Sequence, residues 1–392
     1  MKWELKTFDE IGFIGRGKSR HRPRNAEHLY GGEYPFVQTG DIKAANFRIN
    51  EYSQTYNEAG LAQSKLWKEG TLCITIAANI ADTAILGIDA CFPDSVIGFV
   101  PYEDKSDVRF VKYFFDIFQA RMKSIAVGAA QDNLSLEKLL TFKIPTPPLP
   151  TQRKIASILS AYDDLIENNL KRIKLLEEKA QLHYKIEFGE YQFGDKEPQN
   201  LPKGWTIKSI GDIYGKLESG SRPKGGIDKE LKEGIASVGA ENVIGLGKYN
   251  YQSEKLITEA FFENMNRGKI ENKDILIYKD GAYIGKTTLF QDDFPHEKCC
   301  VNEHVFLLRS KDDLYQNYLF FTLYQKLYFD KMQQLNANAA QPGINQESLK
   351  SLRILWPSEN VIEEFNEKVE SLMKLIFVVA KQNTKLREAR DI

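Results

Sequence analysis

The sequence lacks the features that mark a membrane protein or a protein built around metal or disulfide bonds. No apolar run approaches the ~20 residues that a helix needs to cross a bilayer, and the N-terminus has no charged-then-apolar signal pattern. We therefore expect a cytoplasmic protein. The four cysteines, Cys73, Cys91, Cys299 and Cys300, do not have the spacing of metal ligands, so reduced thiols are the default expectation.

Catalytic signatures are also scarce. No two of the five histidines lie at a ligand spacing, and no Ser or Cys lies in a recognisable nucleophile motif. The Asn-Pro-Pro-aromatic motif that a base methyltransferase would use is missing. The net charge of −1 argues against a protein that coats nucleic acid, but it allows a local basic surface.

Two short motifs suggest catalysis without the context that catalysis needs. Residues 12–19 match the phosphate-loop pattern G-x-x-x-x-G-K-S, yet a basic, proline-containing stretch follows Ser19 where a helix should begin. Pro93-Asp94 and the acidic residues 103–104 resemble a nuclease metal site, but Val301-Asn302 stands at the corresponding place in the second half. We predict no catalytic residue and no metal site in this chain.

The middle of the chain contains one long helical pattern, residues 150–188. Prolines at 147, 148 and 150 oppose an earlier helix, and Thr151 can cap its start. Apolar positions alternate in steps of four and three, as in a coiled coil, over roughly 55 Å of helix. A helix of that length needs a partner beyond a small domain. The predicted seam is Ile155, Leu159, Tyr162, Ile166, Asn169, Ile173 and Leu176.

The C-terminal residues repeat the same spacing and supply the expected partner. Adding 210 to each position of the central seam, beginning with Ile155, reproduces the terminal one in order. Each seam contains one Asn, which costs stability and fixes register. The alternative is two unpaired helices that pack on separate domains. The terminal seam is Phe365, Val369, Leu372, Ile376, Val379, Asn383 and Leu386.

The segments before the two helices form an internal repeat. Each begins with a Trp and an Ile-Gly pair, continues with a loop of Gly, Ser and basic residues, and contains strand patterns and an aromatic-rich helix. The clearest match pairs residues 129–135 with 339–345 at the same offset of 210. We predict an α+β fold: two similar mixed α/β domains, joined and separated by two long antiparallel coiled-coil helices, with pseudo-two-fold symmetry.

The repeated polar loops are the candidate DNA contacts, because arginine suits phosphate and guanine and polar side chains can read base edges. A solvated charged loop is the alternative, weakened by the recurrence of basic residues in both halves. The first-half candidates are Arg16, Lys18, Ser19, Arg20, Arg22, Arg24, Gln38, Thr39, Asp41, Asn79, Gln131 and Asn133. The second-half candidates are Ser221, Arg222, Lys224, Glu241, Asn242, Lys279, Tyr283, Lys286, Gln341 and Asn345.

The chain resembles the DNA-specificity (S) subunit of type I restriction–modification systems over nearly its whole length. The resemblance is carried by Leu201-Pro202-Lys203-Gly204-Trp205, by the repeated Ala-Ala-Gln loop and by the passage 144–155 that leads into the long helix. It implies target recognition domains at 1–145 and 196–357 and helical spacers at 146–195 and 358–392.

The resemblance also implies a function. Each domain would read one half of a split double-stranded DNA site, while the helices set the gap and dock two modification subunits. S-adenosylmethionine, ATP and Mg would belong to the modification and restriction subunits, and this chain would bind no cofactor and catalyse no reaction. The alternative is a non-catalytic coiled-coil scaffold that binds protein or RNA.

Overall fold

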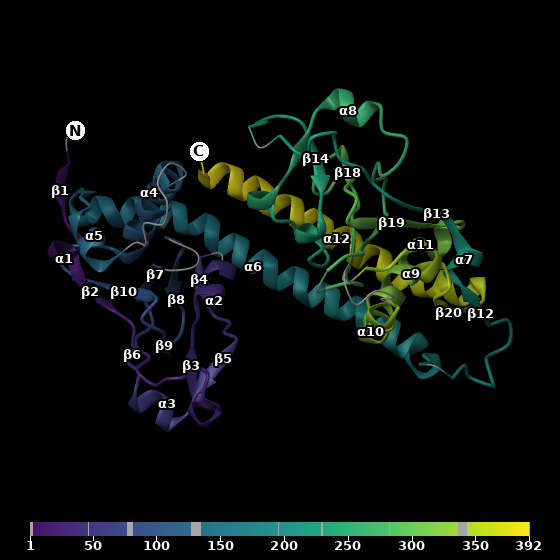
Figure 1. Cartoon of the computed structure of the whole chain (residues 1–392), viewed down its shortest axis with the longest axis horizontal. Coiled ribbons are helices and arrows are strands. Elements are labelled where there is room, and N and C mark those ends of the chain that lie inside the picture. Colours follow the sequence, from purple (N-terminus) through teal and green to yellow (C-terminus); the bar gives the residue numbers. More distant parts are fainter. Residues whose placement is uncertain are drawn as a thin grey trace. The chain divides into compact units, whose positions relative to one another are not determined.

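The computed structural model describes residues 3–45, 47–76, 81–126, 135–194, 196–228, 230–281, 283–335 and 343–391, without the side chains of 120–126. The chain divides into two compact units, Met1–Glu167 (unit 1) and Asn168–Ile392 (unit 2). The 40-residue helix α6 (Leu149–Phe188) contributes residues to both units (Figure 1).

Unit 1 is built on a five-stranded sheet and a four-stranded sheet. The first has the order β2 (Gly12–Arg16), β10 (Val96–Pro101), β7 (Leu72–Thr75), β8 (Thr83–Leu86), β4 (Arg48–Ile49). The second has the order β5 (Gln54–Tyr56), β3 (Tyr30–Phe36), β9 (Ala90–Cys91), β6 (Leu66–Trp67), and β1 (Glu4–Lys6) pairs with β11 (Ile144–Thr146). The helices are α1 (Phe8–Ile11), η1 (Glu27–Leu29), α2 (Thr39–Ala44), α3 (Glu58–Ala62), α4 (Val108–Ala126) and α5 (Leu136–Thr141).

The larger sheet of unit 1 is buried on both faces, which explains why β7 reads as a continuous apolar run. Leu72 and Ile74 enter the core that contains Val111 and Phe115 of α4, whereas Cys73 enters a second core with Trp67. Successive residues of a strand point to opposite faces, so one strand serves both cores. All four residues of β7 are buried.

Unit 2 repeats this plan. Its larger sheet has the order β13 (Tyr214–Ser219), β19 (Val305–Ser310), β16 (Ile275–Tyr278), β17 (Thr287–Leu289). The smaller has β15 (Leu256–Ile257), β14 (Ile235–Val238), β18 (Cys299–Val301), and β12 (Thr206–Ser209) pairs with β20 (Arg353–Trp356). The helices are η2 (Gly189–Tyr191), α7 (Ile210–Ile213), η3 (Ala240–Asn242), η4 (Tyr251–Ser253), α8 (Glu259–Glu263), η5 (Asp313–Tyr315), α9 (Gln316–Leu323), α10 (Lys326–Gln334), α11 (Gln346–Lys350) and α12 (Glu359–Asp391).

The predicted α+β repeat is confirmed down to its local details. In both units a short helix with a reciprocal capping box follows the first strand, Thr7 with Glu10 in unit 1 and Ser209 with Asp212 in unit 2. In both, the first and last strands of the domain form an antiparallel pair, β1 with β11 and β12 with β20. That pairing brings each domain's beginning beside the entrance of the long helix that follows it.

The predicted long helices are present, but α6 begins one residue earlier than expected. Because it begins at Leu149, Thr151 lies inside the first turn and donates its amide to Pro148 O instead of capping the helix. The neighbouring Gln152 is buried and has the larger role. Its amide nitrogen donates to Lys105 O and Pro147 O, and its carbonyl oxygen accepts from the Asp107 amide.

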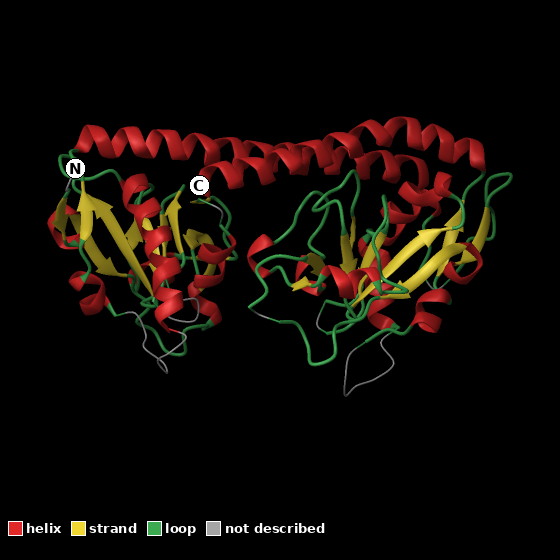
Figure 2. Cartoon of the chain, turned by 90° about the horizontal axis from the view of Figure 1, so that it is seen from above, coloured by secondary structure: helices red, strands yellow, loops and turns green. Residues whose placement is uncertain are grey.

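In unit 2 the C-terminal half of α6 lies along α12 (Figures 1 and 2). Asn169 Nδ2 donates to Asn383 Oδ1 at 2.9 Å, and further along α6 the Tyr184 ring contacts Phe365. Rising numbers in α6 therefore meet falling numbers in α12, so the pairing is antiparallel. It explains why the two seam asparagines are not equivalent in sequence but bond to each other.

The predicted seam residues of α6 and α12 differ in how far they are buried and in what they pack against. Ile155 and Leu159 are partly buried against the unit 1 core that contains Ala156, and Tyr162 is partly buried. The buried seam residues are Ile166, Asn169, Ile173, Phe365, Val369, Leu372, Ile376, Val379 and Asn383. Leu176 and Leu386 are partly buried.

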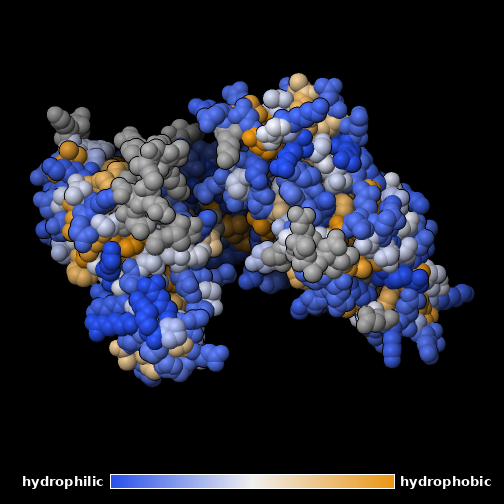
Figure 3. Space-filling model, in the orientation of Figure 1, coloured by the Kyte–Doolittle hydropathy of each residue, from blue (hydrophilic) through white to orange (hydrophobic). Residues whose placement is uncertain are grey.

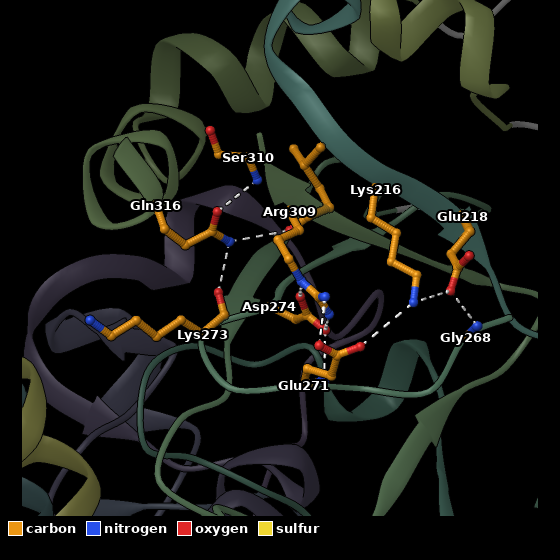
Figure 4. Close-up of polar contacts among 10 residues, drawn as sticks. Lys216, Glu218, Gly268, Glu271, Lys273, Asp274, Arg309, Ser310 and Gln316 are labelled. Atoms are coloured by element: carbon orange, nitrogen blue, oxygen red, sulfur yellow. Dashed lines mark hydrogen bonds and ion pairs between the residues drawn. The ribbon is translucent and has the colours of Figure 1, made fainter. Parts of the chain in front are cut away.

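A polar network reinforces unit 2 between its large sheet and the helices (Figure 4). Arg309 of β19 binds Asp274 through two hydrogen bonds of 2.8 and 2.9 Å and also binds Glu271. Gln316 of α9 donates to Lys273 O, while Lys273 Nζ binds Glu370 of α12 at 2.9 Å. The network thus links the sheet to the terminal helix.

Candidate nucleic-acid interface

The basic loop of unit 1 follows β2 and has a fixed backbone. Gln63 Oε1 accepts from the Arg20 amide at 2.6 Å and from the His21 amide, and Ser64 donates to Lys18 O. Ser19 is buried, with its hydroxyl 3.4 Å from that of Tyr56. Five basic side chains along this stretch are nevertheless exposed, at Arg16, Lys18, Arg20, Arg22 and Arg24. A loop whose backbone is held by hydrogen bonds and whose exposed side chains are cationic is suited to contact phosphate groups.

Two of these arginines contact other groups of unit 1. Arg24 Nη2 donates to both oxygens of Asp94, at 2.7 and 2.8 Å, and Arg22 Nη2 lies 3.7 Å from the same carboxylate. Arg22 Nη1 also folds back onto Ser19 O and His21 O. Arg22 therefore braces the loop, whereas Arg24 is held from one side by Asp94.

The electrostatic environment of the loop is positive. Lys65 lies over the Trp67 ring at 3.5 Å; burial lowers the pKa of Lys65, and the nearby charge of Lys18 lowers it further. Tyr30 donates to Arg24 O, and burial, followed by the proximity of Tyr56, raises the pKa of Tyr30 to about 12. Tyr30 is therefore neutral at pH 7 and adds no negative charge to the basic loop.

The second predicted contact segment of unit 1 has a structural task as well. Asp41 accepts the Gln38 amide in the capping box of α2, and Gln38 Nε2 donates to Gln54 at 2.6 Å. Thr39 begins α2 and is partly buried. The remaining candidates of the first half, Asn79, Gln131 and Asn133, lie outside the described residues, as does Gln341 of the second half.

In unit 2 the candidate residues converge from several loops. Arg222 Nε binds Glu303 Oε1 at 2.9 Å, and His304 lies between Glu303 and Asp280. Asp280 in turn neighbours Lys279 and forms an isolated bridge with Gly343. The loop after β13, the turn after β16, the turn after β18 and the segment before α11 therefore form one polar surface. Ser221 and Lys224, the former partly buried and the latter exposed, belong to the same loop as Arg222.

The turn between β16 and β17 presents an aromatic ring and a cation together. Tyr283 is exposed, and Lys286 Nζ lies 4.0 Å from the centre of its ring. The turn is held from behind because Gln333 of α10 donates to Ile284 O at 2.5 Å. An exposed ring with an adjacent ammonium group is suited to stacking and phosphate contact.

Three further second-half candidates also have partners within the protein. Asn242 is buried and accepts the Asn250 amide, so its side chain holds the 242–250 loop instead of facing solvent; that Asn242 contacts DNA stays a prediction. Asn345 caps α11 by accepting the Ser348 amide, as Ser135 caps α5 in unit 1. Glu241 binds Lys255 at 2.5 Å.

The two enzyme-like motifs lie on elements that do not provide the geometry of a phosphate loop or of a paired-carboxylate site. Residues 12–16 form strand β2, and the Lys18 amide donates to Phe92 O, so no helix N-terminus follows to hold a phosphate. Asp94 precedes β10 and Glu103 follows it, which separates them by roughly 20 Å of strand. In the described part of the chain, no group of three His, Cys, Asp or Glu residues is placed to hold a metal ion.

Sequence reasoning missed the carboxylates beside the loop arginines. The sequence pattern presents Asp94 only as a possible metal ligand, and the repeat alignment indicates no second-half carboxylate there. The structure places Glu303 in the turn after β18, against Arg222. Only the contact reveals this role, because neither turn has a distinctive sequence.

The surface of both units is mostly hydrophilic on the face drawn in Figure 3. None of the helices in the described residues is long and apolar enough to span a membrane. Fold and surface together define a class: a duplicated α+β protein in which each domain presents polar and basic loops and each is followed by a long helix.

The comparisons with known proteins identify the family. A family model described as "Type I restriction modification DNA specificity domain" matches twice, at residues 1–178 and 202–377, so the chain belongs to that family. The chain is 24% identical to the type I restriction enzyme MjaIX specificity subunit of Methanocaldococcus jannaschii, over 99% of this chain and 91% of that one.

Two further relatives agree. The EcoKI specificity subunit of Escherichia coli is 19% identical, over 97% of this chain and 84% of that protein. The crystal structure of the type I restriction–modification S subunit from M. genitalium has the same fold, with a TM-score of 0.55 and 16% identity over 99% of this chain and 94% of that chain.

Proposed function

We propose that this chain is the DNA-specificity subunit of a type I restriction–modification complex and reads a split double-stranded site. The observation that carries the proposal is the duplication itself: the family model matches both halves, and each half presents a different set of loop residues. Two similar but non-identical domains suit two different half-sites. The chemistry of modification would belong to partner subunits that carry S-adenosylmethionine, and this chain would supply recognition alone.

In this proposal the basic loops bind phosphate and the convergent polar surfaces read bases. Lys18 and Arg20 in unit 1, and Lys224 and the Tyr283–Lys286 pair in unit 2, are exposed. Neutralising Arg20, Arg22 and Arg24 should weaken binding and lower the slope of log K against log salt, by about 0.9 for each phosphate that the variant no longer neutralises. An unchanged slope would show that this loop does not contact phosphate.

The long helices are proposed to dock the modification subunits. Ile158, Leu165, Leu175, Leu182 and Ile186 of α6 are each more than half exposed. Large apolar side chains repeated along one helix are a common feature of protein interfaces. Replacing Leu182 and Ile186 by Glu should abolish co-purification with the modification subunit. Ile117→Glu, at an equally exposed Ile on α4, should leave that association intact.

The central test is selection of DNA by the full chain assembled with the modification subunits of its own system. The probe is a library of duplexes with a random centre, sequenced after repeated capture. We expect enrichment of two short sequences with a fixed gap. Insertion of one heptad, about 10 Å, into both helices should lengthen that gap by about three base pairs.

The same experiment separates the alternatives. Enrichment of no duplex sequence, together with binding to RNA or to an unrelated protein, would favour a scaffold. A gap that stays unchanged after heptad insertion would contradict the helices' role as a spacer while leaving DNA recognition in place.

A further inference from the structure

The two units share a contact that lies outside the motifs that identified them. In each, the loop after the first strand of the large sheet carries an arginine bound to a carboxylate in the turn after the corresponding short strand, β9 or β18. The pairs are Arg24 with Asp94 in unit 1 and Arg222 with Glu303 in unit 2. The acids differ in type, and the sequence repeat does not align them.

The close approach of loop and turn is built into the backbone. The Gly17 amide donates to Val96 O, and a Cβ at Gly17 would lie 2.3 Å from Pro93 O. The Gly220 amide donates to Asn302 O, and a Cβ at Gly220 would lie 1.5 Å from Val301 O. Glycine is needed at both positions because any side chain would push the loop off the turn. The arginine and the acid are therefore brought together by the fold in both units.

A contribution to the stability of the fold does not explain these arginine–carboxylate pairs. The side chains of Arg24 and Arg222 are 49% and 58% exposed, and exposed ion pairs contribute little to folding. A carboxylate on a surface that binds DNA also repels phosphate and lowers affinity for any sequence. The presence of such a carboxylate in both units is explained if the carboxylate favours binding to the target DNA sequence over other sequences.

The geometry of the pairs indicates that benefit. Glu303 Oε1 lies 2.9 Å from Nε of Arg222, so the end of the guanidinium formed by the two Nη atoms, which can bond O6 and N7 of guanine, has no contact with this carboxylate. Asp94 contacts Arg24 through Nη2 alone, which leaves the Nε and Nη1 N–H groups of Arg24 to make single hydrogen bonds to a base edge. A guanidinium held on one edge loses less conformational freedom when it binds a base through another.

We propose that Asp94 and Glu303 are specificity-determining positioning residues, each of which orients the loop arginine of its own unit toward base edges and disfavours binding to non-target phosphate. The proposal rests on the DNA-reading function proposed above and names residues that act in it. Each acid acts on one half-site, because each lies within a different unit.

The test is DNA selection by the full chain with its modification subunits, using Asp94→Asn, Glu303→Gln and the wild type. Affinity is also measured for one fixed duplex that lacks the selected sequence. We expect each variant to lose about threefold to tenfold discrimination at one or two base pairs of one half-site only, and the two variants to affect opposite halves. Affinity for the non-target duplex should rise about twofold, since a negative charge is removed.

Charge-matched controls separate positioning from simple electrostatics. Asp89→Asn removes the acid of the exposed Lys68–Asp89 pair in unit 1, and Asp330→Asn does the same for Lys326–Asp330 on α10 of unit 2. Both should leave the base preferences unchanged. Glu303→Asp and Asp94→Glu should recover part of the discrimination that the neutral variants lack.

The outcomes are distinct. If the wild type selects a split site and both variants keep its full base preferences, the inference is wrong and the proposed function stands. If the variants raise target and non-target affinity equally, the acids act only as charges and the inference is again wrong. If the wild type selects no sequence, the proposed function fails and the inference fails with it.

Discussion

The two units hold the same helix by different chemistry. In unit 1 the buried residues of α6 are mainly polar: Gln152, Ser160 and Asp163 beside Ala156 and Ile166. In unit 2 they are mainly apolar, and Ile173, Ala180, Tyr184 and Phe188 belong to the large domain core together with α12. A domain that packs on a single helix can fix the position of that helix through hydrogen bonds. Two helices that pack on each other need a continuous apolar seam.

Additional ion pairs and hydrogen bonds support this contrast. Arg48 of unit 1 binds Asp164 at 2.7 Å and Glu167 at 3.1 Å, and Tyr113 donates to the buried Asp163. Unit 1 therefore fixes the rotation of α6 with directional contacts. In unit 2 the rotation is fixed by shape, because Tyr184 and Phe188 pack among the rings of Tyr318 and Phe365.

The largest expected effect is in the apolar attachment. Phe365→Ala removes a fully buried ring that contacts Tyr184, Phe188 and Phe321, and should lower the free energy of unfolding by about 3–5 kcal/mol. Urea denaturation of the full chain measures this. A loss below about 1 kcal/mol would mean that α12 does not depend on this core, and the contrast between the units would fail.

The matching change in unit 1 is Gln152→Ala. It removes one acceptor and two donor interactions, and it leaves the Asp107 amide and the carbonyls of Lys105 and Pro147 without that partner. We expect a loss of about 2–3 kcal/mol from these backbone groups. Gln152→Glu is the control: it keeps the size and the acceptor of the side chain but places a buried carboxylate against two carbonyl oxygens, so it should be at least as destabilising as Gln152→Ala at pH 7. Equal stability of all three proteins would show that polar contacts do not hold α6 in unit 1.

The buried asparagine pair tests the one polar feature of the unit 2 seam. Asn169→Leu leaves Asn383 buried without its partner, which should cost about 1–2 kcal/mol. Adding Asn383→Leu should recover or exceed wild-type stability, because two apolar residues then replace a buried polar pair in which Asn383 Nδ2 has no hydrogen-bond partner. A double variant less stable than the single one would show that the pair contributes more than register.

Periodicity allowed the seam to be predicted only where a helix meets another helix. Ile166, Asn169 and Ile173 were predicted and are buried, because a/d spacing follows from helical geometry. Nearer the start of α6 the predicted Ile155 and Leu159 are partly buried, while the fully buried positions are Gln152, Ala156 and Ser160. There α6 packs on the surface of a domain through hydrogen-bonding side chains. A pattern of apolar residues cannot predict which face of the helix is buried in such a contact.

The candidate interface was predictable to a lesser degree. The basic loops were found because they recur in both halves, and the exposed Tyr283–Lys286 pair lies where a turn was expected. The burial of Asn242 could not be predicted, because an Asn in a polar turn has the same sequence pattern whether it faces solvent or, as here, supports a loop from within. Glu303 could not be found, since its role depends on a contact across roughly 80 residues of sequence.

The smallest expected effect concerns Glu370, a carboxylate that joins α12 to the large-sheet side of unit 2. Burial raises the pKa of Glu370, but hydrogen bonds from Lys273 and Asn317 outweigh it, and the pKa lies below its ordinary value of 4.5. A carboxyl with a lowered folded pKa stabilises the fold above its unfolded pKa and loses that contribution as pH falls through the folded value. The free energy of unfolding of the wild type should therefore exceed that of Glu370→Gln by about 1 kcal/mol at pH 7. The difference should shrink steadily below about pH 4.5. Urea titrations of both proteins at several pH values measure this difference in unfolding free energy. The pH dependence that comes from all other titratable groups is common to both proteins and cancels in the difference. A difference that is constant with pH would mean that Glu370 stabilises unit 2 through packing and not through its charge.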